Sequence, residues 1–276
     1  MSEIHVFNHR AMATQFQVRI ADEEKTYAAQ TAQAAFALTD ELESRLSRFR
    51  ANSEIARIAQ LGVGEKLRLT GPVFACLKIA KKMEHATRGA FSVTAAALKT
   101  QPTRPLWSLL PDEFSIRCDS GRLEFDLGAI GKGFALDRMA EVLREWSCPA
   151  FLLVAGGSSI LAGNAPAETA GWSCGLGDDN SPQRFWLKNS SLSGSGLAVK
   201  GKHILDPRTG ASAALRNRVW ALTDTAAESD ALSTAGMILG ESEISAVAGK
   251  DESWLVFLQE NENWRHLGRR PIPPAA

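Results

Sequence analysis

An excess of charge of either sign is missing from this sequence. The 276 residues contain 31 basic and 31 acidic side chains, so the formal net charge is zero. Such a chain has no overall field to hold nucleic acid or an anionic membrane. Nucleic acid is therefore not expected as a partner, and a phosphate group would have to be bound locally by backbone donors, a few cations or a metal ion.

Cysteine is scarce as well. The sequence has no CxxC pair and no histidine cluster beside a cysteine, so neither a disulfide framework nor a zinc site is expected. We expect the four cysteines to be reduced and mostly buried: Cys76, Cys118, Cys148 and Cys174.

Long apolar runs are also absent. The start, MSEIHVFNHRAMATQ, carries charges and lacks the apolar core of a secretory or lipoprotein signal. No stretch approaches the roughly 20 apolar residues of a membrane-spanning helix. The sequence thus predicts a cytoplasmic chain without a membrane span.

What the sequence does contain is a mixture of helical and strand-like segments. Apolar residues at helical spacing predict helices at 24–49, 54–59, 71–88, 133–146 and 227–240. Alternating or short apolar runs predict strands at 16–20, 114–126, 151–157, 170–176, 190–197, 217–223 and in a closing pair near 253–267. The tract QPTRPLWSLLP at 101–111 is interpreted as loop. Without repeats or a flexible linker, this pattern predicts one α+β domain over 1–276, with mixed sheets, flanking helices and two interlocked subregions around one cleft.

The segment FDLGAIGKGFAL at 125–136 is a glycine-rich turn that leads into a helix and carries Asp126 and Lys132. Its glycines let the backbone approach a ligand, and the helix N-terminus favours an anion. It matches neither GxGxxG nor the P-loop, which needs Ser or Thr where Gly133 stands. Taken alone, the segment fits a phosphate-binding turn or plain connectivity.

A second segment, ESDALSTAGMILG at 228–240, places Asp230 and Thr234 four residues apart, on one face of a helix. A carboxylate and a hydroxyl on one face suit Mg²⁺, which prefers oxygen ligands. The alternative is helix capping by Ser229 or Asp230, and spacing alone favours the cap.

Two further segments allow a binding or a purely structural reading. In GKHILDPRTG at 201–210, His203 and Asp206 could orient a ligand or move a proton, but D-P-x-T-G is also good turn chemistry. The run SLSGSGL at 191–197 could wrap a phosphate or merely bend a strand.

These segments occur in one order, and together they resemble the ApbE family of FAD:protein FMN transferases over residues 11–254. The similar elements are AMAT, SRFRANSEIARI, GAFSVTAAAL, FDLGAIGKGFALD, LLVAGGSSILAG, HILDPRTG and SDALSTAGMILG. The resemblance implies a T-fold-like α+β architecture around one FAD cleft. It implies that FAD is surrounded by Met12, Phe49, Ala90, Phe91, Ser92, Asp126, Lys132, His203, Ile204 and Asp206. It also implies a Mg²⁺ ion held by the Ala129 carbonyl, Asp230 and Thr234.

The reaction that the resemblance implies is transfer of the FMN part of FAD to a Thr or Ser hydroxyl of a redox protein, with release of AMP. The acceptor would carry a D-x-x-[ST]-[GS]-[AS]-[ST] type motif. Asp230 would act through the metal, and His203 would orient or deprotonate the acceptor hydroxyl. The alternatives are a metal-dependent FAD pyrophosphatase, in which water replaces the acceptor, and a flavin-binding protein without turnover.

Three positions depart from the family pattern. Ser92 stands where the family usually has Asp, which favours the non-catalytic alternative. Phe49 replaces a frequent Tyr, so a ring can still stack on the flavin but loses a hydrogen bond. Ala13 replaces Gly, which we expect to be a modest steric change.

Overall fold

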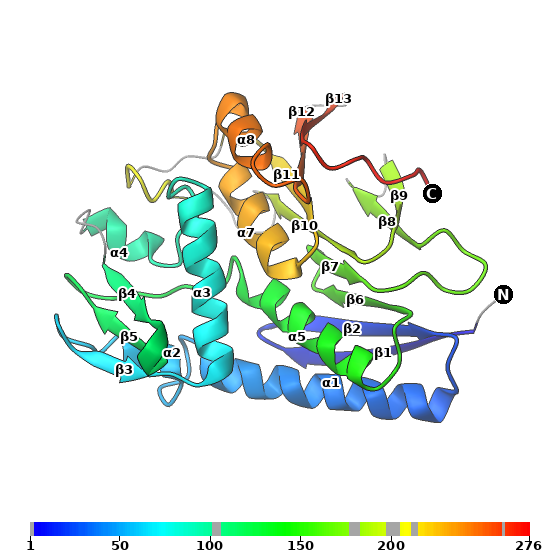
Figure 1. Ribbon diagram of the computed structural model, residues 1–276, viewed down its shortest axis with the longest axis horizontal. Coiled ribbons are helices and arrows are strands. Elements are labelled where there is room, and N and C mark those ends of the chain that lie inside the picture. The colour runs from blue at the N-terminus through cyan, green and yellow to red at the C-terminus, as the bar shows by residue number, and fades with distance from the viewer. Residues whose placement is uncertain (1–2, 101–105, 177–182, 197–204, 211–214, 261–262) are drawn as a thin grey trace.

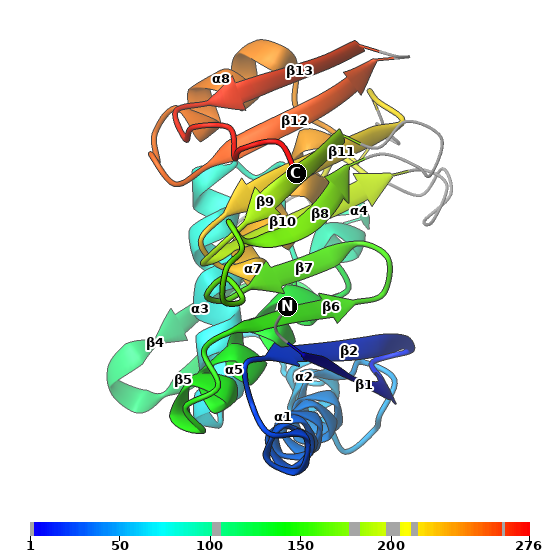
Figure 2. The same ribbon diagram turned by 90° about the vertical axis from the view of Figure 1, so that its right-hand side faces the viewer.

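The computed structural model describes residues 3–100, 106–176, 183–196, 205–210, 215–260 and 263–276. An eight-stranded antiparallel sheet runs through the molecule (Figures 1 and 2). Its strands, in spatial order, are β1 (Ile4–Ala11), β2 (Thr14–Ala21), β6 (Phe151–Ala155), β7 (Ser159–Ala162), β10 (Ser190–Gly196), β11 (Arg218–Thr223), β12 (Leu255–Glu260) and β13 (Asn263–Gly268).

Helices cover one face of this sheet (Figure 2). They are α1 (Lys25–Leu46), α5 (Gly131–Glu145) and α7 (Ala226–Gly236), and α8 (Glu241–Ala248) packs near the edge formed by β12 and β13. Helix α1 forms because its apolar residues recur at helical spacing, and Ala28, Ala32, Ala35 and Leu42 are buried as that spacing predicts.

The opposite face of the sheet is covered by the hairpin of β8 (Trp172–Leu176) and β9 (Gln183–Leu187). Trp172 and Leu187 belong to a separate apolar cluster with sheet residues such as Leu192. The sheet is therefore buried on both faces along its middle strands.

A second subregion lies to one side of the large sheet (left in Figure 1). It comprises α2 (Glu54–Ile58), α3 (Gly71–Ala86), α4 (Ala95–Thr100), the 3-10 turn η1 (Pro111–Glu113) and a small sheet of β3 (Lys66–Arg68), β5 (Ser115–Cys118) and β4 (Trp107–Leu110). One continuous cluster of buried apolar side chains joins both subregions, from Phe16 of β2 to Leu77 of α3 and Ile116 of β5. The α+β class expected from the sequence is confirmed.

Several element predictions are wrong in detail. The tract 101–111 is not all loop, because β4 occupies 107–110; residues 101–105 lie outside the described residues. Trp107 is 1% exposed and packs 5.3 Å from the ring of Phe125, so tertiary packing overrides the local proline signal. The strand expected at 114–126 ends at Cys118.

The elements β1, β3, β7, β9, α4 and α8 were not predicted. In β1, Ile4 and Val6 face outward at 45% and 48% exposure while His5 is buried, so the apolar alternation that marks a strand is reversed.

Within the described residues, no helix combines the length and the apolar character needed to cross a membrane.

Candidate functional site

The glycine-rich turn forms as expected, but α5 begins at Gly131, two residues before the predicted start at 133. Asp126 closes the turn: its Oδ1 accepts the Gly128 N–H at 2.8 Å, and its own N–H donates to the Val93 carbonyl at 2.7 Å. The first bond fixes the orientation of the carboxylate, and the second fixes the backbone of the residue that carries it.

Gly133 is required by the contact between α5 and α7. A Cβ atom there would lie 2.0 Å from the Ala226 carbonyl oxygen and 2.3 Å from its carbon. Only glycine lets the two helix backbones approach this closely.

The two helices cap one another. From α7, Asp230 Oδ2 accepts the N–H of Gly133 in the first turn of α5, at 2.8 Å. From α5, Asp137 accepts the N–H groups of Ala226 and Ala227 in the first turn of α7, at 2.7 and 2.9 Å. Each carboxyl group thus accepts hydrogen bonds from free N–H groups at the N-terminus of the other helix. Asp230 is a cap after all, but of α5 rather than of its own helix.

Burial raises the pKa of Asp137 to about 7, from an ordinary value of 3.8. The charge of Asp230 acts in the same direction, and the two backbone N–H groups oppose it. A raised carboxyl pKa means that the folded chain holds this proton more tightly than the unfolded chain. The stability contributed by Asp137 is therefore fullest below pH 3.8 and is lost as the pH rises through about 7.

We accordingly expect Asp137→Asn to flatten the pH dependence of stability. Between about pH 5 and about pH 8, the free energy of unfolding of the natural chain should fall relative to the variant by on the order of a few kcal/mol. Urea unfolding in metal-free buffer at both pH values measures this. Parallel pH profiles for the two proteins would contradict the assignment of the titration to Asp137.

Hydroxyl groups line the other side of α7. Ser159 Oγ donates to Asp230 Oδ1 at 2.6 Å, and Ser195 Oγ lies 3.2 Å from Thr234 Oγ1. The Ser229 hydroxyl forms hydrogen bonds with two serines of β10, at 2.8 and 2.7 Å, so it connects α7 to β10. Asp230 and Thr234 are therefore held in place by neighbouring side chains before any ligand arrives.

Asp230 and Thr234 face one cavity of about 290 Å³, as their helical spacing predicts. The cavity is also lined by Met12, Ala13, Thr14, Ala129, Lys132, Gly156, Gly157, Ser158, Gly194, Ser195 and Gly196. Each Asp230 oxygen accepts one bond and has a further lone pair. With the Thr234 hydroxyl and the nearby Ala129 backbone, this is a hard-oxygen donor set that fits Mg²⁺. The described residues contain no group of three or more His, Cys, Asp or Glu side chains suited to a metal.

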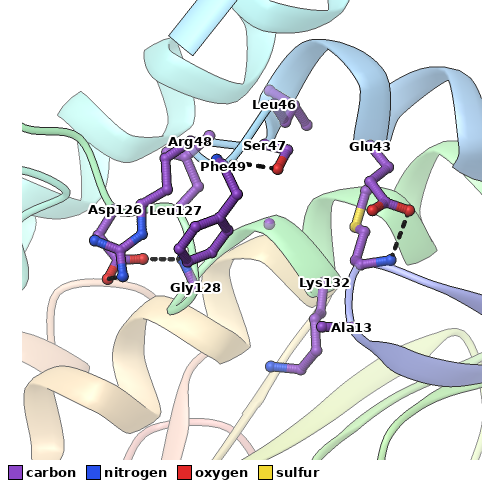
Figure 3. A pocket seen from close by; sticks show the side chains of 12 residues that line it. Ala13, Glu43, Leu46, Ser47, Arg48, Phe49, Asp126, Leu127, Gly128 and Lys132 are labelled. Carbon is purple, nitrogen blue, oxygen red and sulfur yellow. Dashed lines mark hydrogen bonds and ion pairs between the residues drawn. The ribbon is translucent and has the colours of Figure 1, made fainter. Parts of the chain in front are cut away.

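A second cavity, of about 220 Å³, adjoins the first and shares Met12, Ala13 and Lys132 with it (Figure 3). Its other lining residues are Glu43, Leu46, Ser47, Arg48, Phe49, Asp126, Leu127, Gly128 and Gly131. Phe49 is 84% exposed, and its ring extends over the cavity. One ligand with a flat apolar part and an anionic part could therefore occupy both cavities.

The turn between β1 and β2 forms part of both cavities and is strained. Met12 and Ala13 have φ values of 51° and 56°, in the left-handed region that favours glycine. Glu43 Oε2 accepts the Met12 N–H at 2.9 Å and helps to hold this conformation. The departure at Ala13 is therefore a matter of backbone strain and not of side-chain volume.

Ala13→Gly should consequently stabilise the chain. Release of left-handed strain is worth about 1–2 kcal/mol, and the added freedom of the unfolded chain offsets about 0.4–1 kcal/mol of it. We expect the free energy of unfolding to rise by roughly 0.5–1 kcal/mol, measured by urea unfolding. Ala11→Gly, two residues earlier at the end of β1 and without a positive φ, is the control and should destabilise the chain. If Ala13→Gly destabilised the chain, the left-handed backbone at Ala13 would not be a source of strain.

The remaining expected site residues lie elsewhere. Ala90 and Phe91 are both 1% exposed and line neither of these two cavities. Ser92 Oγ donates to Glu84 Oε1 at 3.1 Å, so a carboxylate lies beside the position where the family usually has Asp. Sequence reasoning missed Glu84, which lies eight residues earlier on α3 and carries no motif.

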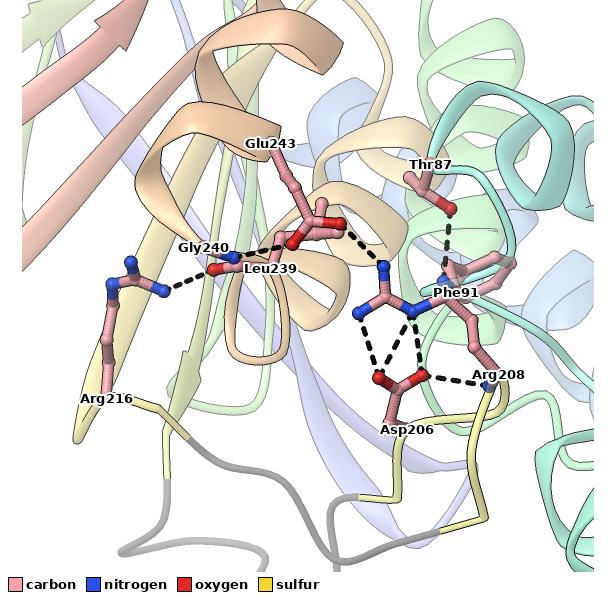
Figure 4. Close-up of polar contacts among 8 residues, drawn as sticks. All are labelled: Thr87, Phe91, Asp206, Arg208, Arg216, Leu239, Gly240 and Glu243. Atoms are coloured by element: carbon pink, nitrogen blue, oxygen red, sulfur yellow. Dashed lines mark hydrogen bonds and ion pairs between the residues drawn. The ribbon is translucent and has the colours of Figure 1, made fainter.

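Asp206 forms a structural ion pair (Figure 4). Its carboxylate accepts hydrogen bonds from Nε and Nη2 of Arg208, at 2.9 and 2.8 Å. Nη1 of Arg208 donates to Glu243 at 2.8 Å. The segment D-P-x-T-G forms the turn that its sequence predicts, because the Gly210 N–H donates to the Asp206 carbonyl at 2.8 Å. His203 and Ile204 lie outside the described residues.

Sequence reasoning also missed Glu43, Arg48 and Ser195 as lining residues. Ser195 belongs to the SLSGSGL run, which was considered for phosphate binding, and Arg48 belongs to the element SRFRANSEIARI, whereas Glu43 lies in no motif.

Comparison with known proteins supports the resemblance. The FAD:protein FMN transferase of Vibrio cholerae is 23% identical over 269 residues, covering 82% of this chain and 78% of that protein. The Haemophilus influenzae protein of the same name is 22% identical, covering 92% and 86%. Among solved structures, the flavin transferase ApbE from Vibrio cholerae aligns with a TM-score of 0.80 at 20% identity, covering 96% of this chain and 97% of that one. The ApbE protein from Thermotoga maritima aligns with a TM-score of 0.81 at 19% identity, covering 96% and 97%.

The structural likeness, at such low identity, concerns the fold. The sequence model of the ApbE family, in contrast, matches residues 12–257, which is most of the chain and includes both cavities. The chain therefore belongs to the ApbE family.

Proposed function

We propose that this protein transfers the FMN part of FAD to a Thr or Ser hydroxyl of a target flavoprotein, with Mg²⁺ as cofactor and AMP as the second product. The observation that carries the proposal is the pair of adjoining cavities, one with an exposed aromatic ring and the other with oxygen donors, joined at Met12, Ala13 and Lys132. The relatives named FAD:protein FMN transferase support the same reaction.

In this proposal, the flat part of FAD lies in the cavity of Phe49 and the pyrophosphate in the cavity of Asp230. Lys132 lines both cavities and follows directly on the first residue of α5, so its ammonium group can bind the phosphates where the two meet. For Ala90, Phe91, Ser92, His203, Ile204 and Asp206, the assignment to FAD rests on the family resemblance.

The Ala129 carbonyl, Asp230 and Thr234 would hold the metal ion. A bound Mg²⁺ ion would screen the pyrophosphate charge and stabilise the charge that develops on the leaving phosphate. The contribution of the chain is a preformed donor set: the Ser159 hydroxyl and the Gly133 N–H fix the Asp230 carboxylate, and the Ser195 hydroxyl lies beside Thr234. Such donors need little reorganisation during the reaction.

The reaction balances without another reactant. The acceptor oxygen bonds to the phosphorus that carries riboflavin, the bond from that phosphorus to the AMP oxygen breaks, and the hydroxyl proton is released. We propose that His203 orients the acceptor hydroxyl or accepts its proton. The acceptor would be a redox protein with a D-x-x-[ST]-[GS]-[AS]-[ST] type motif, and the cytoplasmic location expected from the sequence stays a prediction.

Incubation of the purified protein with FAD, Mg²⁺ and a test protein that carries the acceptor motif tests the proposal. AMP release and the mass of the acceptor are followed together. We expect the acceptor to gain the mass of FMN less one water, and we expect no gain when EDTA is present from the start of the incubation. Release of AMP and free FMN without labelling, over several acceptor sequences, would instead establish the pyrophosphatase. FAD that is bound but unreacted would establish a flavin-binding protein.

A further inference from the structure

The loop after α1 presents two side chains that contribute little to the stability of the fold. Phe49 is 84% exposed, so burial does not hold its ring. Arg48 and Asp126 are 48% and 52% exposed in their side chains, and their closest N–O distance is 3.6 Å. Ion pairs this exposed stabilise a fold weakly. All three residues nevertheless line the same cavity.

Asp126 is the fixed member of this group. Its Oδ1 accepts the Gly128 N–H at 2.8 Å, and its N–H donates to the Val93 carbonyl at 2.7 Å. Its other oxygen, Oδ2, lies 3.6 Å from Nη2 of Arg48. The carboxylate can therefore anchor the guanidinium from a position that the turn has already set.

Arg48 connects this anchor to the aromatic ring. Its guanidinium carbon lies 4.7 Å from the centroid of the Phe49 ring, within the range of a cation–π contact. Figure 3 shows Arg48 between Asp126 and Phe49 at the side of the cavity opposite Lys132 and Ala13. Asp126, Arg48 and Phe49 thus form a continuous chain of contacts that ends in an exposed ring.

The backbone of this loop is held as well. Ser53 Oγ donates to the Ser47 carbonyl at 2.6 Å, and the Phe49 N–H donates to Ser47 Oγ at 3.3 Å. The loop is therefore closed at its base.

We propose that Arg48 is a ligand-positioning residue: paired with the fixed carboxylate of Asp126, its guanidinium holds the exposed Phe49 ring as a cavity wall against which a flat ring of FAD stacks. The inference rests on the proposed function for the identity of the ligand. Its physical basis is preorganisation, since a ring already held in its binding orientation loses less freedom when the ligand arrives. The family resemblance assigns no role to position 48.

The test is a double-mutant cycle on FAD affinity, with Mg²⁺ present and no acceptor, measured through the change in flavin fluorescence on binding. Arg48→Ala should weaken FAD binding about tenfold. Phe49→Leu should weaken it at least as much, and the double variant should bind no more weakly than Phe49→Leu alone, because Arg48 acts through the ring. Arg48→Lys, which keeps the charge without the planar group, should recover part of the affinity.

Two further measurements separate positioning from a general structural effect. In the transfer assay, Arg48→Ala should raise the KM for FAD by a similar factor and change kcat less. The control is Arg57→Ala, an exposed arginine of α2 that lines neither cavity and should leave FAD affinity unchanged.

Each outcome decides the matter. Unchanged FAD affinity in Arg48→Ala would overturn the inference and leave the proposed function standing. Additive losses in the double variant would also overturn it, since Arg48 would then act independently of Phe49. If the natural chain binds no FAD, both the inference and the proposed function fail.

Discussion

Thr234→Val is expected to lower metal-dependent transfer by about 10²-fold or more, with little loss of folding stability. Valine keeps the shape of threonine and removes one of the proposed oxygen donors. The hydroxyl lost makes one described side-chain contact, to Ser195 at 3.2 Å. The Mg²⁺ concentration needed for half-maximal transfer should rise, and the affinity for Mn²⁺, measured by electron paramagnetic resonance, should fall.

The control for this variant is Ser233→Ala on the same helix. Ser233 is 1% exposed, donates to the Asp230 carbonyl at 3.0 Å, lies 3.0 Å from the Ser195 hydroxyl and does not line the cavity of Asp230 and Thr234. Removal of the Ser233 hydroxyl should cost as much stability as removal of the Thr234 hydroxyl, and it should leave the metal affinity unchanged. If Thr234→Val binds Mn²⁺ like the natural chain, Thr234 is not a ligand.

Asp230 is a less suitable residue for the same question. Its carboxylate accepts bonds from both Gly133 and Ser159, so Asp230→Asn would turn an amide N–H₂ toward one of these donors. An unsatisfied buried group of this kind costs about 1–3 kcal/mol. Lost activity in Asp230→Asn would therefore mix an effect on the metal with an effect on the fold.

Gly133→Ala is expected to destabilise the chain by about 3 kcal/mol or more. The added Cβ would lie 2.0 Å from the Ala226 carbonyl oxygen, and backbone atoms of a helix can move away only if α5 and α7 separate. Separation would also lengthen the bonds of Asp230 and Asp137 to the opposite helix. The midpoint of urea unfolding measures the loss.

Gly131→Ala is the matched comparison, two residues away on the same helix. Its Cβ would lie 3.6 Å from Leu127 Cβ, an ordinary contact, and alanine is favoured over glycine in a helix by about 0.5–1 kcal/mol. This variant should be neutral or more stable. A Gly133→Ala protein as stable as Gly131→Ala would show that the two helices do not need their close approach.

The sequence was most informative where a local pattern decides the structure. Helix α1 follows from its apolar spacing, and the placement of Asp230 and Thr234 in one cavity follows from their separation by four residues. The order of motifs indicated the family and with it the α+β class. These features depend on neighbours in the sequence or on a pattern spread over the whole chain.

Contacts between distant segments could not be predicted. Asp230 accepts from Gly133, 97 residues away, and nothing in either segment announces that bond. Likewise, Ala13 was read as a change of volume because φ is invisible in a sequence, and Trp107 was read as loop because its packing partner Phe125 comes later in the chain.

The mutual capping of α5 and α7 has a consequence for how this chain can vary. Asp137 and Asp230 each accept a bond from the opposite helix, and Gly133 permits the close approach on which both bonds depend, so a change at one of these positions weakens the contact that the others support. In a drifting population of sequences, these three positions are expected to change together or not at all. Because Asp230 also lines the cavity of about 290 Å³, selection for folding alone would preserve this carboxylate, which we propose as a metal ligand, even in descendants that no longer carry out the reaction.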